Sequence, residues 1–224
     1  MKCARAAPLD SFLRSTVAGP PLVRLLGAWT PVETDASGMD FAERLGLWVG
    51  PVDAIGLQQA QQAIRTAAAR PSRAQAVRAQ PVAEEWHKVR SVLAQAVAKP
   101  FEADPEQGGV PWRERHLELQ RQMEMMITAL REHVRKALGA ASPRLRQLAA
   151  LDTAMQEALA ARTQALLASL PALLERRYAQ LRAAQSLESF PSDWRQALLA
   201  ELELRLAPVT GLVEALTNES ESGP

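Results

Sequence analysis

Apolar residues recur every three or four positions along most of the chain, which is the spacing of one face of an α-helix. Prolines and glycines divide this pattern into segments. Four short helices are predicted in the first hundred residues, at about 22–29, 40–49, 52–69 and 81–98. Together they predict an N-terminal helical module over residues 20–98, preceded by a flexible N-terminus at residues 1–19.

The pattern lengthens beyond a polar loop at residues 99–110. The segment 111–138 has no internal glycine or proline, and its apolar stripe includes Leu119, Met123 and Leu130. This segment predicts one long helix. Gly139 follows it directly, at the place where glycine commonly ends a helix.

A second, longer helix is predicted to begin at Ser142 and Pro143 and to reach about residue 188. Serine is a preferred N-cap and proline is favoured at the first helical position. Leucines recur at three- or four-residue steps, and Pro171 lies among them. Proline in a helix interior removes a hydrogen bond, so a kink near Ser169 or a short break is expected, and the sequence leaves this choice open. The short connection between the two long helices favours an antiparallel hairpin.

The last part of the chain predicts two further helices, from Phe190 to about Leu206 and from Val209 to Leu216, separated by Pro208. They complete a unit at residues 111–216, and residues 217–224 read as a disordered acidic tail. The predicted fold class is therefore all-α, with a short-helix N-terminal module followed by a long antiparallel helical hairpin of coiled-coil-like character.

Composition supports a helical fold and removes some function classes. The chain has 224 residues, of which 47% are hydrophobic and 4% aromatic, with only 11 glycines. Strands favour aromatic and β-branched residues, so this balance argues against an all-β fold. The formal net charge of +1 gives no overall drive towards nucleic acid or an anionic membrane. This small net charge is the sum of a basic first part of the chain and an acidic last part.

Cysteine content and hydropathy bear on the compartment. Cys3 is the one cysteine, so no intramolecular disulfide can form. The first residues contain no apolar run of the kind found in a secretory signal. The longest nearly apolar stretch, 165–174, is far shorter than the roughly 20 residues of a membrane-spanning helix. These observations predict a soluble, cytoplasmic protein.

Side chains that carry chemistry are few. Glu84 and His87 have the Glu-x-x-His spacing of carboxylate-bridged metal sites in helical bundles, but neither His116 nor His133 repeats it. No nucleophile elbow and no glycine-rich phosphate loop is present. We therefore expect no catalytic residues, no metal site and no cofactor, and we predict that the protein is not an enzyme.

The apolar stripes lead to the main functional hypothesis, a non-enzymatic interaction or scaffold protein that associates by helix-in-groove or coiled-coil contacts. A protein partner or self-association is expected, although the same stripes could instead pack against each other within one chain. The candidate seam comprises Met123, Met126, Leu130, Leu159, Leu166, Leu170 and Leu174.

A DNA-binding regulator is the alternative hypothesis. The segment 65–78 is basic, and no acidic residue lies between Asp53 and Glu84, so it could contact phosphates. No aromatic residue interleaves this segment, and the whole chain is nearly neutral, which argues against nucleic acid as the partner. The candidate contacts are Arg65, Arg70, Arg73 and Arg78.

A further indication comes from three short segments, Leu22 to Leu26, Phe41 to Trp48 and Asp53 to Leu57. They resemble the N-terminal signature of a family of uncharacterised bacterial proteins, catalogued as a domain of unknown function. The resemblance covers about residues 20–60, and the long helices agree with it in character. It implies no activity, cofactor or catalytic residue. It does imply a soluble accessory of an envelope-associated complex.

Overall fold

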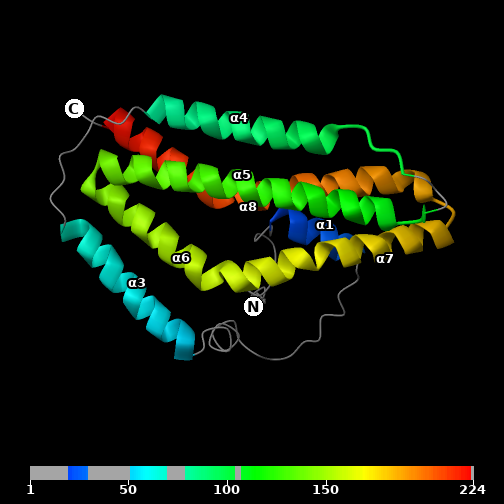
Figure 1. Cartoon of the computed structure of the whole chain (residues 1–224), viewed down its shortest axis with the longest axis horizontal. Coiled ribbons are helices and arrows are strands. Elements are labelled where there is room, and N and C mark those ends of the chain that lie inside the picture. The colour runs from blue at the N-terminus through cyan, green and yellow to red at the C-terminus, as the bar shows by residue number, and fades with distance from the viewer. Residues whose placement is uncertain (1–19, 30–50, 70–78, 104–106, 223–224) are drawn as a thin grey trace, which may run out of the picture.

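The structure is a computed structural model that describes residues 20–29, 51–69, 79–103 and 107–222. Every regular element within these ranges is a helix, which confirms the all-α prediction. The α-helices are α1 (Pro21–Trp29), α3 (Pro51–Ala69), α4 (Ala79–Ala98), α5 (Val110–Ala141), α6 (Pro143–Ala168), α7 (Leu170–Ala183) and α8 (Phe190–Ser222). A 3₁₀ turn, η3 (Leu187–Ser189), precedes α8. Figure 1 shows α4, α5 and α8 extending along the long axis of the molecule, with α6 and α7 following one another beside α5.

The hairpin of α5 and α6 turns more tightly than the sequence predicts. Gly139 does not end α5, which continues to Ala141, and Ser142 alone separates the two helices. The prediction that Ser142 caps the second helix is confirmed, because its Oγ accepts a hydrogen bond from the backbone N–H of Leu145 at 3.2 Å. Arg146 further secures the turn by donating from Nε to the carbonyl of Gly139 at 3.0 Å.

Of the two alternatives predicted near Ser169, the structure has the short break, in which Ser169 alone separates α6 from α7. Pro171 lacks the amide hydrogen that would bind the carbonyl of Leu167 in a continuous helix. The Ser169 side chain instead donates to the carbonyl of Leu166 at 2.6 Å, closing the last turn of α6. Figure 1 shows α7 following directly from the end of α6.

The C-terminal helix differs from the sequence prediction in two respects. Pro208 does not interrupt it, and α8 continues through residues predicted as a disordered tail as far as Ser222. Leu206 and Val209 on either side of the proline are both buried, as is Leu216 further on. Burial of this apolar face outweighs the loss of one backbone hydrogen bond, which explains why the helix persists.

The N-terminal helices do not form a module of their own within the described residues. Instead, α1 packs on α8, α3 packs on α6, and α4 packs on both α5 and α8. Val89, Leu93 and Val97 of α4 belong to the same core as the long helices. The helix predicted at 40–49 lies outside the described residues, so its prediction stands as made.

An aromatic cluster joins four parts of the chain at one end of the bundle. Trp112 of α5 meets Trp194 and Phe190 of α8, with ring centroids 5.0 and 5.3 Å apart. Tyr178 of α7 lies 5.0 Å from Phe190, and Phe101 lies 5.0 Å from Trp112. Most of these contacts are edge-to-face, the arrangement that aromatic rings favour. The cluster fixes α5, α7 and α8 relative to the segment that follows α4.

Candidate functional site

Several large apolar side chains on α6 are exposed to solvent. Leu151, Met155 and Leu159 are 43%, 48% and 42% exposed, and Leu166 is 68% exposed. These four residues, which we call the α6 stripe, follow one another at steps of four, four and seven residues, which places them on one helix face. Every residue from 157 to 166 is exposed, although α3 packs on α6. Contiguous apolar surface of this kind is characteristic of interaction sites.

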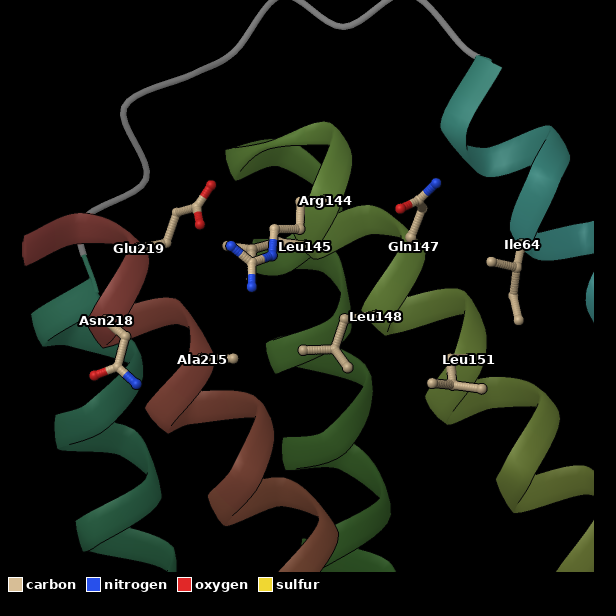
Figure 2. Close-up of a pocket in the computed structure, with 9 residues that line it drawn as sticks. All are labelled: Ile64, Arg144, Leu145, Gln147, Leu148, Leu151, Ala215, Asn218 and Glu219. Carbon is tan, nitrogen blue, oxygen red and sulfur yellow. The ribbon is translucent and has the colours of Figure 1, made fainter. Parts of the chain in front are cut away.

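A groove of about 680 Å³ continues from the stripe towards the turn between α5 and α6. Figure 2 shows its floor on α6, where Leu148 and Leu151 point into it, and its two walls on α3 and α8. Ile64 lines the α3 side and Ala215 lines the α8 side. The groove and the stripe therefore form one elongated apolar surface along α6.

Charged residues mark this surface at both ends. Arg144 lines the groove at the beginning of α6, with Glu219 across from it on α8. Arg162 is exposed and lies three residues after Leu159 and four before Leu166, which places it on the same face of the helix. Glu157 is exposed too, but its position along the helix places it on the opposite face.

A buried polar network lies between α5 and α8. Glu201 is completely buried and accepts hydrogen bonds from Nε of Arg205 at 2.8 Å and from Nε2 of Gln120 at 3.0 Å. The Nε2 of His116, which is equally buried, lies 3.3 Å from a carboxylate oxygen of Glu201. Arg205 also reaches Glu124 at 2.6 Å. A buried charge is tolerated because it is paired and hydrogen-bonded in this way.

The same network holds the end of α6. Gln120 donates to the backbone carbonyl of Leu167 at 3.1 Å, in addition to its bonds to Glu201. This carbonyl is the one that Pro171 leaves without a helical donor. The amide of Gln120 thus replaces the missing backbone group, and the far end of the α6 stripe has a fixed position.

A second network holds the middle of α6. Asp152 accepts hydrogen bonds from Nε of Arg131 at 2.8 Å and from Nε of Arg135 at 2.7 Å, both from α5. Arg135 also donates to Gln156, one turn further along α6, at 2.7 Å. These contacts attach one face of α6 to α5, while α3 packs on α6 from another side and leaves the stripe partly exposed.

Both networks lower the pKa of their central carboxyl group. Burial, the largest single effect, raises the pKa of Glu201, but the interactions with His116 and Arg205 together outweigh it. Burial likewise raises the pKa of Asp152, and its bonds and charge interactions with Arg131 and Arg135 outweigh it. In both cases the net pKa lies below the usual range.

This shift predicts loss of stability in acid. Because the pKa of each group is lower in the folded than in the unfolded chain, each contributes stability above the unfolded pKa of about 4. That stability is lost as the pH falls from there through the lower folded pKa. We expect the urea midpoint to fall over this window. The double variant Glu201→Gln, Asp152→Asn should show a flatter dependence on pH, and a profile parallel to that of the original chain would contradict the assignment.

The structure separates the seven predicted seam residues into two groups. Met123, Leu130, Leu170 and Leu174 are buried in the molecule, and Met126 is partly buried against the core. Leu159 and Leu166 are exposed on α6. The two exposed leucines lie on α6 and the two buried ones on α7, on either side of Ser169.

Sequence reasoning missed the buried networks and the arginines of the α6 face. His116 lies three residues before Leu119 and Glu201 three residues after Leu198, so each belongs to an apolar stripe, and a polar residue at such a position indicates a buried partner. Arg144 and Arg162 continue the three- and four-residue steps of the exposed leucines. Both signals were present in the sequence.

The other candidates are more dispersed. Arg65 is exposed on α3, whereas Arg70, Arg73 and Arg78 lie outside the described residues. His87 is exposed on α4. Among the described residues, no group of three or more His, Cys, Asp or Glu side chains is arranged to hold a metal ion. No helix in the described part of the chain combines the length and hydropathy needed to cross a membrane.

The fold and the exposed face of α6 define an elongated helical-bundle protein with an open apolar surface on one helix. The chain belongs to the DUF3348 family, described as proteins of unknown function, whose family model matches residues 10–218. The match extends well beyond the segments that carried the resemblance in the sequence. Comparison with curated proteins and with solved structures found no match.

Proposed function

We propose that the protein is a non-enzymatic interaction or scaffold protein that binds a protein partner through the exposed face of α6. The observation that carries the proposal is the α6 stripe, in which Leu159 and Leu166 remain exposed while the inner face of the same helix is bound to α5. A partner helix packed on the stripe would remove its leucines from water. Such burial is the main source of affinity in helix-in-groove recognition.

A cytoplasmic location belongs to the same proposal. The role implied by the family resemblance, a soluble accessory of an envelope-associated complex, requires a surface that binds another protein. The α6 stripe supports that role because it is continuous with a groove and is held from behind by Asp152 and Gln120. Preorganised surfaces of this kind lose little conformational entropy on binding.

Site-specific crosslinking in cells tests the proposal. A photoreactive residue at Leu159 or Leu166 should give a discrete crosslinked species, whereas one at Gln180 or Arg182, which are exposed on α7, should give none. A second variant combines Met155→Glu with the photoreactive residue at Leu159. Its crosslink should be lost, because a carboxylate in the stripe opposes burial of the stripe against a partner.

Two further measurements complete the test. The Met155→Glu variant should unfold at nearly the same urea concentration as the original chain, because the residue is largely exposed. Equal crosslinking from α6 and α7, or none from α6, would contradict the proposal. Salt-dependent binding to duplex DNA that is lost in Arg65→Ala would favour the alternative instead.

A further inference from the structure

The helix α3 is held by much less buried surface than a helix of similar length in the same molecule. Within the described part of the chain, α3 packs extensively on α6 alone. None of its described side chains, at residue 56 and residues 58–67, is buried. The helix α4 has 20 residues against 19 in α3, yet it buries six of them in the core shared with α5 and α8. Because apolar burial is what holds a helix in a bundle, α3 is more weakly attached than α4.

Small side chains predominate on the face of α3 that meets α6. Ala60, Ile64 and Ala67 are the partly buried members of the described set, and steps of four and three residues place them on one face of the helix. Ile64 lines the groove together with Gln147 and Leu151 of α6, as Figure 2 shows. Two alanines around one isoleucine cover little of a neighbouring helix. Leu151 accordingly remains 43% exposed, although α3 packs on the same helix.

The position of α6 does not depend on α3. Asp152 is bound to Arg131 and Arg135 of α5, and the carbonyl of Leu167 accepts a hydrogen bond from Gln120. Local openings of a protein cost less free energy where few apolar side chains are buried. Release of α3 therefore leaves α6 folded on the bundle and widens the accessible face that contains the α6 stripe.

We propose that α3 is a displaceable helix that competes with the partner protein for α6. The partner supplies one amphipathic helix that packs on α6 in place of α3, with larger apolar side chains where α3 has Ala60 and Ala67. This proposal rests on the proposed function and adds its regulation, because the partner must displace α3 before it binds. The apparent association constant then equals the intrinsic constant multiplied by the fraction of molecules in which α3 is released. Larger side chains favour the partner because they remove more of α6 from water.

Native-state hydrogen exchange measures the release of α3 directly. The amides of α3 should exchange through an opening that costs less free energy than global unfolding and depends only weakly on urea. The central amides of α5 should exchange only on global unfolding, with the full dependence on urea. Exchange of both helices in one global step would overturn the proposal.

A synthetic helix serves as the probe for displacement. It has the sequence of residues 51–69, with leucine in place of Ala60 and Ala67. A control peptide of the same composition class carries its two leucines in place of Gln58 and Gln62, on the opposite face of the helix. Measured by fluorescence anisotropy, the first peptide should bind the full chain roughly tenfold more tightly than the control peptide. Equal binding of the two peptides, or no binding of either, would overturn the proposal.

Variants of the protein show whether α3 is the element that the peptide displaces. Ile64→Ala should tighten binding of the first peptide roughly tenfold because it raises the released fraction, whereas Gln61→Ala on the exposed face of α3 should leave binding unchanged. A short bismaleimide that joins Ile64→Cys to Gln147→Cys, in a chain that also carries Cys3→Ser, tethers α3 to α6. Tethering should weaken binding at least about tenfold relative to the same chain capped with N-ethylmaleimide. Equal binding by the tethered and the capped chains would overturn the proposal.

The crosslinks in cells test the proposed function separately. Leu166 is 68% exposed, so a photoreactive residue there reports a partner that packs beside α3 as well as one that packs in its place. A crosslink from Leu166 together with unchanged binding in the tethered chain would reject the displacement of α3 and leave the proposed function standing. Absence of crosslinks from α6 would reject the proposed function, whatever hydrogen exchange shows for α3.

Discussion

Replacing Glu201 by alanine is expected to destabilise the protein by about 3–5 kcal/mol, the cost of removing one member of a buried charged pair. The carboxylate is the common acceptor for Arg205 and Gln120, and it lies 3.3 Å from the imidazole of His116. Alanine leaves these three groups next to a cavity with unmet hydrogen-bonding capacity. Urea unfolding at pH 7 measures the loss.

A matched control lies two residues further along the same helix. The side chain of Glu203 is 55% exposed and forms a long ion pair with Arg90, at 3.9 Å. Glu203→Ala should change the free energy of unfolding by less than about 0.5 kcal/mol. If the two variants had similar stabilities, the network around Glu201 would contribute little, and its role in holding α5 to α8 would be wrong.

The second large effect is expected from Trp194→Ala, at about 3–5 kcal/mol. Trp194 is buried, and its ring lies 5.0 Å from Trp112 and 6.1 Å from Phe101. Alanine would open a cavity where α5, α8 and the segment after α4 meet. Such a cavity removes both the burial and the dispersion contacts of the indole.

Trp194→Phe is the corresponding control. Phenylalanine keeps an aromatic ring at the site and removes the indole Nε1, which has no hydrogen-bond partner among the described residues. The smaller ring loses packing and lowers the free energy of unfolding, whereas removal of the unbonded N–H donor raises it. The net loss of stability should be about 1 kcal/mol. Denaturant unfolding followed by far-UV circular dichroism avoids the change in fluorescence. An alanine variant as stable as the phenylalanine variant would contradict the assigned packing.

Those elements of the fold that have strong local signals could be predicted from the sequence. Ser142 and Pro143 mark the start of α6 because their capping chemistry acts over one turn, and Pro171 marks the interruption because it lacks a donor. Pro208 carries the same local signal, yet α8 continues through it. Buried residues flank both prolines, so neither the local signal nor burial alone separates the two cases.

The candidate site was predictable only in part, for a related reason. Periodicity identifies an apolar face but not the element that covers it. Leu159 and Leu170 have the same pattern in the sequence, and the structure leaves the first exposed and buries the second. Likewise, the approach of Gln120 to Glu201 joins residues 81 positions apart, which no local pattern reveals.

The sequence separation across this network has a consequence for the order of folding. The hairpin of α5 and α6 forms between neighbouring segments joined by one residue, so its closure is fast. The contacts of Gln120 and Arg205 with their partners close loops of 81 residues. Such long loops carry a larger entropic cost, so we expect these contacts to form later than the hairpin. Loss of the Glu201 network should then raise the rate of unfolding more than it lowers the rate of folding.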